Sequence, residues 1–435
     1  MKPIRSQNFM NWMGCFLIAL AFLLLIHPKT LIIYGVQLVA IAMVVYAVYW
    51  FIQRWNNHTK NRVFDKTLKT YLFPMSMIFA ASLLIFWRDY SPLVLAMIIG
   101  MYQLIVGLIG TYSYYLLVRD GVYNHWIQLI NPLIHLMFGL WTFFASDRIE
   151  DTIFRLAIYL GLLGCNYIFD GWLQGSKHLI SYQKRRIRIP MPAIFTLLFP
   201  YQMLMKVNKM LNQDEDTVIE RLNPDSEEKS DAGLEVFIHI SPFGFDRIGH
   251  TDIVYKNQVY TFGNFDAETR RLFGTVGDGV MFTTDRESYL KFLMRRQVTV
   301  MSFGVSLTDC EARDLEKALT KLMTTTKPFE MSTDRQKQGY VGALIDLANP
   351  QFYKFKRGLF QTYFVLGTNC VTFVDDLIWK SGVDIFAFAG IMTPGAYLDY
   401  FNKAYFSYTS KVVRRRIYHR RLMQKLNERQ DKGSL

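Results

Sequence analysis

Six apolar runs near the start of the chain constrain its fold more than any other feature. They lie near 10–27, 31–53, 69–87, 92–117, 126–145 and 152–172. Each is close to the length of about 20 residues that a helix needs to cross the hydrocarbon core of a bilayer. We therefore predict a six-helix transmembrane domain over residues 1–175, whereas residues 207–435 have the composition of an ordinary soluble domain.

Basic residues gather on alternate sides of these runs, which predicts the topology. They follow the second and sixth runs, at 54–66 and 184–188, whereas the opposite loops carry few. The positive-inside rule then predicts a multi-pass protein of a bacterial inner membrane, with the N-terminus and the C-terminal domain in the cytoplasm. Residues 187–205 hold three prolines, and we interpret them as an interfacial or re-entrant segment. If they cross the bilayer instead, the C-terminal domain is periplasmic.

The net charge of +13 indicates contact with an anionic surface. The basic residues cluster beside the apolar runs and in the C-terminal tail, without the aromatic-interleaved stripes typical of nucleic-acid binding. We expect membrane lipids, and no nucleic acid, as partners. The four cysteines show no Cys-x-x-Cys or Cys/His ligand spacing, so we expect neither a disulfide framework nor a metal or other cofactor.

Composition shifts divide the remainder of the chain. Residues 176–232 combine the basic interfacial segment with an acidic linker, and residues 409–435 predict a basic C-terminal tail helix at the membrane surface. Between them, residues 233–408 carry strand and helix patterns that predict an α+β domain. The expected strands are 234–240, 251–255, 259–262 and 297–306, and the expected helices are 285–295, 307–324, 336–348, 370–382 and 393–407.

Two short motifs in this domain indicate chemistry. Gly249-His250-Thr251 opens an expected strand, and Thr368-Asn369-Cys370 opens an expected helix. The thiolate is the reactive form of cysteine, and a helix N-terminus and a neighbouring imidazole both favour it. We therefore predict Cys370 as nucleophile and His250 as its general base. Thr368 and Asn369 are candidates for capping the helix, and the Asn369 amide is an alternative donor to an oxyanion.

A third side chain is expected to orient His250. If a three-residue turn joins 251–255 to 259–262, Asn264 lies opposite His250 and its carbonyl accepts from the imidazole. A two-residue turn shifts the opposite position to Gly263 and brings Thr261 onto the same face. We favour Asn264, with Asp266 as the other candidate, and we interpret His239 as an incidental strand residue.

Four ordered segments of this domain resemble a known family. They are SPFGFDRIGHTDIVY (241–255), VYTFGNFDAET (259–269), GTNCVTFVDDLIWKSG (367–382) and MTPGAYLDYF (392–401). They resemble the Lnb N-terminal periplasmic domain family, which is similar to circularly permuted NlpC/papain-like cysteine hydrolases. The resemblance implies a permuted papain-like fold with His250 as base and Cys370 as nucleophile. In one departure, residues 237–240 read Phe-Ile-His-Ile where an apolar-Thr-Cys ending is expected.

The layout of the six apolar runs, in turn, resembles the HdeD-like acid-resistance membrane family. The whole chain is thus predicted to be a multi-pass α-helical membrane domain followed by an α+β permuted papain-like domain. Its predicted function is that of a membrane-anchored cysteine hydrolase acting on amide or peptide bonds, including cell-wall peptide. Two alternatives stay open: an acyltransferase or lipase acting on lipid acyl groups, and a non-catalytic membrane stress protein.

Overall fold

The computed structural model describes residues 3–61, 68–86, 91–123, 126–144, 149–175, 233–240, 249–383, 393–407 and 410–419. The chain forms two compact units. The helical unit comprises Gln7–Ile109 and Ile130–Trp172, and the sheet unit comprises Met1–Ser6, Gly110–Leu129 and Leu173–Leu435. The basic interfacial segment and acidic linker expected at 176–232 lie outside the described residues.

Within the described part of the first 175 residues, six helices lie at the positions of the six apolar runs. They are α1 (Pro3–Ile26), α2 (Pro28–Asn61), α3 (Leu68–Phe86), α4 (Ser91–Arg119), α5 (Ile127–Phe144) and α6 (Ile149–Gly175). By length and composition, Ile33–Ile52 in α2 and Ala96–Arg119 in α4 can cross a membrane, and the other four helices carry shorter apolar stretches. The apolar helical region is confirmed, and a crossing by all six helices stays a prediction.

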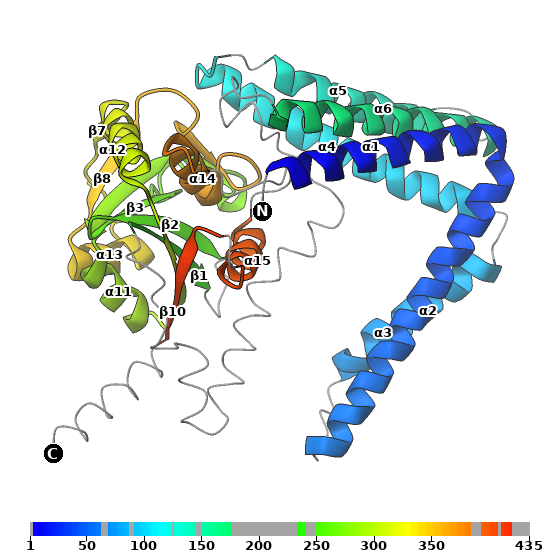
Figure 1. Ribbon diagram of the computed structural model, residues 1–435, viewed down its shortest axis with the longest axis horizontal. Helices are drawn as coiled ribbons and strands as arrows, with labels where there is room; N and C mark the ends of the chain where they lie inside the picture. The colour runs from blue at the N-terminus through cyan, green and yellow to red at the C-terminus, as the bar shows by residue number, and fades with distance from the viewer. Residues whose placement is uncertain are drawn as a thin grey trace. The chain divides into compact units, whose positions relative to one another are not determined.

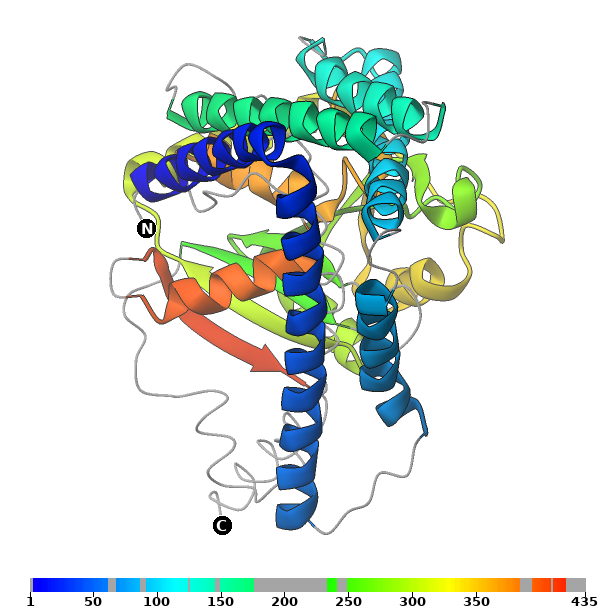
Figure 2. The same ribbon diagram turned by 90° about the vertical axis from the view of Figure 1, so that its right-hand side faces the viewer.

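Small residues bring helices of the helical unit together. Helix α1 lies beside α6 in both views (Figures 1 and 2), and a Cβ placed on Gly14 would lie 2.6 Å from the carbonyl oxygen of Gly164. Gly107 of α4 and Gly139 of α5 face Leu136 and Leu104 in the same close manner. Close backbone approach at glycine is typical of helix packing in membranes, where dispersion forces and not water exclusion hold helices together.

The sheet unit is built on an eight-stranded sheet whose strand pairs are antiparallel. Its strands lie in the order β10-β6-β1-β2-β3-β5-β8-β7. They are β1 (Leu234–Ile240), β2 (His250–Tyr255), β3 (Gln258–Gly263), β5 (Val280–Asp285), β6 (Thr299–Val305), β7 (Thr326–Pro328), β8 (Gln351–Phe355) and β10 (Val412–Tyr418). A second, two-stranded sheet pairs β4 (Val276–Asp278) with β9 (Thr362–Phe364).

Helices cover both faces of the large sheet because neighbouring residues of each strand point to opposite faces. Helices α12 (Asp309–Thr324), α14 (Cys370–Lys380) and α15 (Pro394–Tyr405) share one apolar cluster with strand residues such as Ile253. Helices α11 (Arg286–Arg295) and α13 (Gly339–Ala348) share the other with residues such as Val254. Figure 1 shows α12 and α14 on one side of the sheet and α11 and α13 on the other. The sheet-rich C-terminal region is confirmed, and the papain-like fold stays a prediction.

One expected element is wrong within the described residues. Residues 412–418 were expected to begin a tail helix, and they form the edge strand β10 instead. The strand pairs with β6, and its β-branched residues Val412 and Ile417 are buried against the large sheet. Burial of these side chains against the sheet therefore favours a strand over the helix predicted from the basic pattern. Residues 420–435 lie outside the described part of the chain.

Candidate active site

Cys370 is the first residue of α14 and is 3 % exposed. Asn369 caps this helix, because its Oδ1 accepts a hydrogen bond from the backbone N–H of Thr372 at 3.0 Å. The Asn369 amide nitrogen donates to the carbonyl of Val365, so this structure uses both ends of the Asn369 amide to hold the helix start. Thr368 Oγ1 donates to the carbonyl of Thr362 at 2.6 Å and fixes the preceding turn.

A histidine, an aspartate and a second histidine share one face of strands β1 and β2. His250 and Asp252 are two positions apart on β2, so both side chains point to the same face. His239 of β1 lies directly opposite His250 in the antiparallel register. Residues directly opposite each other are close neighbours on one face, which brings the three polar side chains together.

The Asp252 carboxylate lies between the two imidazoles. Its Oδ1 is 3.0 Å from His250 Nε2, its Oδ2 is 2.7 Å from His239 Nε2, and the Tyr289 hydroxyl donates to Oδ2 at 3.2 Å. The nearby Cys370 side chain also acts on the ionisation of His250. The side chain of Asp252 is fully buried, whereas that of His250 is 26 % exposed, so His250 is the member of the cluster that reaches the surface.

These contacts set the charge of the cluster. Burial alone would lower the pKa of His250, but the adjacent Cys370 and Asp252 raise it well above the ordinary value of 6.5. Burial would raise the pKa of Asp252, but the charges of His239 and His250 lower it far below its ordinary value. The cluster therefore favours an anionic Asp252 and a protonated His250 beside the sulfur at neutral pH.

The two side chains expected to orient His250 have other contacts. A two-residue turn at Lys256 and Asn257 joins β2 to β3, and the paired positions run from Tyr255–Gln258 to Ile253–Tyr260. Continued along the strands, this register places Gly263, and not Asn264, opposite His250. The expected three-residue turn is therefore wrong. Asn264 Nδ2 donates to the carbonyl of Gly274 instead, at 3.2 Å.

Asp266, the other candidate, belongs to a separate ion cluster. Its Oδ2 lies 2.6 Å from Lys354 Nζ, and its Oδ1 accepts from Gln336 at 2.8 Å. Lys354 also contacts Asp278 at 2.7 Å. These interactions tie β8 to the segment that follows β3, and they account for both carboxylate oxygens of Asp266.

Sequence reasoning missed Asp252 and underrated His239. The spacing His-x-Asp within a strand was available as a signal, because it places both side chains on one face. The contact of His239 depends on the register between β1 and β2, which a strand pattern alone does not fix. Among the described residues, no group of three or more His, Cys, Asp or Glu side chains is arranged to hold a metal ion.

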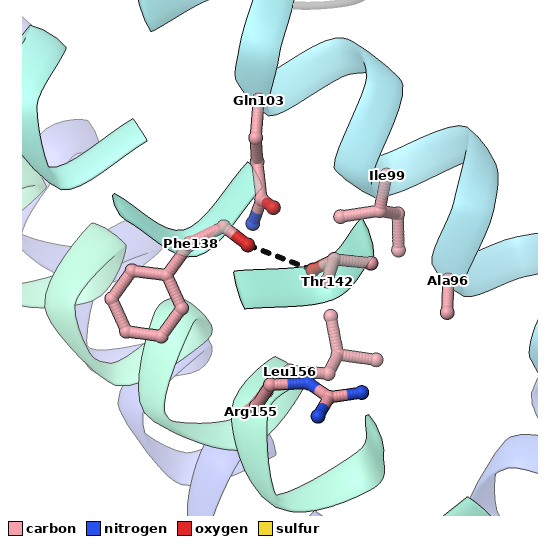
Figure 3. A pocket seen from close by; sticks show the side chains of 7 residues that line it. All are labelled: Ala96, Ile99, Gln103, Phe138, Thr142, Arg155 and Leu156. Atoms are coloured by element: carbon pink, nitrogen blue, oxygen red, sulfur yellow. Dashed lines mark hydrogen bonds between the residues drawn. The ribbon is translucent and has the colours of Figure 1, made fainter. Parts of the chain in front are cut away.

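The helical unit contains a small cavity that offers no comparable site. Its volume of about 20 Å³ is close to the room that one water molecule needs. Figure 3 shows its lining, in which Thr142 Oγ1 donates to the carbonyl of Phe138 at 2.8 Å. It is lined by Ala96, Ile99, Gln103, Phe138, Thr142, Arg155 and Leu156. A peptide or acyl substrate is far larger than this cavity.

Comparison with known families places a repeat in the helical region. The family model described as "Short repeat of unknown function (DUF308)" matches residues 12–66 and 75–144. The two matches lie among the apolar helices α1 to α5 and support the membrane region expected from the HdeD-like layout. They cover less than half of the chain and do not include His250 or Cys370. The helices and this match together define a membrane-associated protein with a sheet-rich C-terminal region.

The same comparisons give no match of the chain to a curated protein or to a solved structure.

Proposed function

We propose that the chain is a membrane-anchored thiol hydrolase in which Cys370 attacks the carbonyl carbon of an amide or ester. The observation that carries this proposal is the placement of Cys370 at the capped start of α14, near enough to His250 to raise its pKa, while His250 Nε2 lies 3.0 Å from Asp252 Oδ1. A thiol, an imidazole and a carboxylate in series are the groups that nucleophilic acyl transfer needs.

The reaction follows from these groups. In the resting pair, His250 holds the proton of the Cys370 thiol, and the thiolate of Cys370 forms a bond to the carbonyl carbon. The imidazolium then gives its proton to the departing amine or alcohol, which leaves a thioester on Cys370. Water attacks the thioester, His250 accepts its proton, and the carboxylic acid is released as the thiol re-forms. The backbone N–H of Cys370 has no carbonyl partner four residues earlier in α14, so it is a candidate donor to the oxyanion.

Asp252 takes the orienting role in this proposal. It replaces Asn264, because its Oδ1 is 3.0 Å from His250 Nε2 whereas Asn264 binds the carbonyl of Gly274. A buried carboxylate holds the imidazole in one orientation and stabilises its protonated form. The overall chain organisation is proposed as a multi-pass membrane domain followed by a permuted papain-like domain.

A thiol-directed probe on the full chain tests this proposal. We expect a chloroacetamide probe to label Cys370 in the wild type and about 100-fold more slowly in His250→Ala, because the imidazole no longer accepts the proton. Cys310→Ser is the matched control, since Cys310 is exposed and lies in α12. Equal labelling of Cys370 with and without His250 would rule out the thiol mechanism and favour the non-catalytic membrane role.

The side of the membrane is proposed as cytoplasmic for both the N-terminus and the sheet unit. The alternation of basic loops supports this orientation. Residues 187–205, whose crossing would reverse the placement of the sheet unit, lie outside the described residues. A reporter enzyme that is active on only one side of the membrane, fused after residue 435, measures the orientation. Activity on the periplasmic side would overturn the cytoplasmic placement.

A further inference from the structure

A short loop of the sheet unit displays two large apolar side chains to the outside. The 270–275 loop contains a short 3₁₀ turn, η2 (Leu272–Gly274). Phe273 is 98 % exposed and Leu272 is 58 % exposed. Large apolar side chains of the described sheet strands are mostly buried, so this pair is unlike its surroundings. Exposed apolar residues gathered at one point mark an interaction surface.

The loop is held in this shape by its own contacts. The Thr275 hydroxyl donates to the carbonyl of Leu272 at 2.8 Å, and Asn264 Nδ2 donates to the carbonyl of Gly274 at 3.2 Å. Leu272 and Phe273 both adopt the left-handed backbone conformation, with φ of 48° and 56°. Bulky side chains rarely occupy this conformation, and it persists only where the surroundings enforce it.

The charges beside Leu272 and Phe273, which form the tip of the loop, indicate the kind of partner that this tip binds. Arg270 and Arg271 precede the apolar pair and are exposed. The Arg270 guanidinium donates to the carbonyl of Asn264, which holds one positive charge beside the loop. An apolar tip with a basic rim is complementary to a bilayer surface, where acyl chains lie below anionic headgroups.

The loop is connected through β4 and β9 to the end of an apolar helix. Strand β4 follows the loop directly and pairs with β9. Within the same unit, the Arg119 guanidinium at the end of α4 donates to Thr362 of β9, and the backbone N–H of Gly358 donates to the carbonyl of Asp120 at 2.7 Å. The Ala96–Arg119 segment is long and apolar enough to cross a membrane. The end of such a helix lies near the bilayer surface.

The same loop is connected to the start of α14. The backbone N–H of Val365 donates to the carbonyl of Thr275 at 3.0 Å. The carbonyl of Val365 in turn accepts from Asn369, the residue before Cys370, at 3.0 Å. Two hydrogen bonds therefore link the loop to the cap of the helix that begins with Cys370.

We propose that Leu272 and Phe273 insert into the surface of the bilayer and hold the sheet unit there. The proposal of insertion is argued from the exposed side chains of the loop and does not depend on the proposed function. Its consequence for the substrate rests on the proposed function: Cys370 then works at the lipid–water boundary, and the carbonyl that it attacks belongs to an acyl group of a membrane lipid.

Fluorescence of the full chain in vesicles tests the insertion independently of catalysis. Cys15, Cys165, Cys310 and Cys370 are replaced by Ser, and the dye NBD is attached at Phe273→Cys. The matched control carries NBD at Lys291→Cys on α11, where the side chain is 71 % exposed. In vesicles with anionic lipid, we expect blue-shifted emission at 273 that is quenched by lipids spin-labelled in the acyl chain, and neither effect at 291. Equal, unquenched emission at both positions would overturn the insertion.

Turnover measurements test the consequence for the substrate. Phe273→Asn keeps a residue that tolerates the left-handed backbone, and removal of so exposed a side chain leaves the core intact. We expect turnover of a vesicle-embedded acyl ester to fall about tenfold or more, whereas turnover of a soluble short-chain ester stays unchanged. An equal effect on both substrates contradicts the lipid assignment. If wild type turns over neither ester, the proposed function fails while the NBD result still decides the insertion.

Discussion

The two units of this chain place their apolar side chains in opposite ways. In the helical unit, large residues such as Trp12 and Phe144 are exposed, whereas buried positions include Ala40 and Ala47. In the sheet unit, Phe237 and Phe373 are fully buried. Exposed apolar helices with small residues inside are typical of a lipid environment, and buried aromatic residues are typical of a core formed in water. Buried charged side chains such as Asp252 are paired in the sheet unit, which is the better place for polar chemistry.

The two units each hold a buried or half-buried histidine, and these offer the sharpest contrast. His135 of α5 is held by the carbonyl of Asn131 at 2.8 Å and by the Tyr159 hydroxyl at 3.1 Å, whereas His250 Nε2 lies 3.0 Å from the buried Asp252 carboxylate. We expect His250→Gln to lower kcat/KM about 10²- to 10⁴-fold, because the proton acceptor is lost. His135→Gln is expected to leave it within about twofold. Esterase assays on the full chain compare the two, and a similar loss from both would erase the contrast.

Aromatic residues test the same contrast through stability. Phe373 of α14 stacks on Phe262 of β3 with ring centroids 5.2 Å apart, whereas Phe79 of α3 is 66 % exposed. We expect Phe373→Ala to lower the free energy of unfolding of the sheet unit by about 3–5 kcal/mol, since it leaves a cavity in the core. Phe79→Ala is expected to change unfolding by about 0.5 kcal/mol or less. Pulse proteolysis in urea measures both, and comparable losses would show that Phe79 is also part of a packed core.

Two aspartates of the sheet unit separate a charge effect from a folding effect. Asp252→Asn removes a charge that raises the pKa of His250, so the imidazolium loses its proton at lower pH. The alkaline limb of the pH–activity profile therefore moves to lower pH. We expect turnover at neutral pH to fall about 10- to 100-fold. Asp266→Asn, whose carboxylate pairs with Lys354, is expected to leave the alkaline limb in place. A pH–rate profile that moves equally in both variants contradicts the orienting role of Asp252.

Two helix caps give the smallest expected effect. Asn369 caps α14 and Thr308 caps α12, each through a side-chain oxygen that accepts a backbone N–H. Replacement by Ala is expected to cost about 1 kcal/mol of stability in either case. Only Asn369→Ala is expected to lower turnover beyond what the stability loss explains, because its helix begins with Cys370. Thermal unfolding combined with esterase assays separates the two, and equal turnover losses would place Cys370 outside the reaction.

Long periodic elements were predictable from the sequence because burial and propensity agree there. The six helices and the strands 234–240 and 259–262 follow directly from apolar runs and alternation. The motifs around His250 and Cys370 also predicted a strand start and a helix start, and β2 and α14 begin at these residues. Strand β10 was missed because its run of arginines was taken as part of a basic helix. Its β-branched residues Val412, Val413 and Ile417 favour a strand and alternate in part with polar residues.

The third member of the cluster was less predictable because it depends on a turn and a register. Lys256 and Asn257 adopt φ of 47° and 63°, which is the conformation of a two-residue hairpin turn. A three-residue turn between the two strands would shift the residue opposite His250 by one position, from Gly263 to Asn264. The contact between Asp252 and His239 likewise requires that β1 pair with β2 in one register. Short turns and registers are determined by tertiary contacts that a single sequence does not display.

Capture of an acyl-enzyme tests whether Cys370 is a nucleophile that depends on His250. The full chain is incubated with an activated acyl ester, quenched in acid, and digested for mass spectrometry. We expect an acyl adduct on the peptide that contains Cys370. Neutral hydroxylamine should remove this adduct, as it removes a thioester, and the adduct should be absent in His250→Gln. An adduct that forms equally on the exposed Cys310, or that forms on Cys370 regardless of His250, would contradict it.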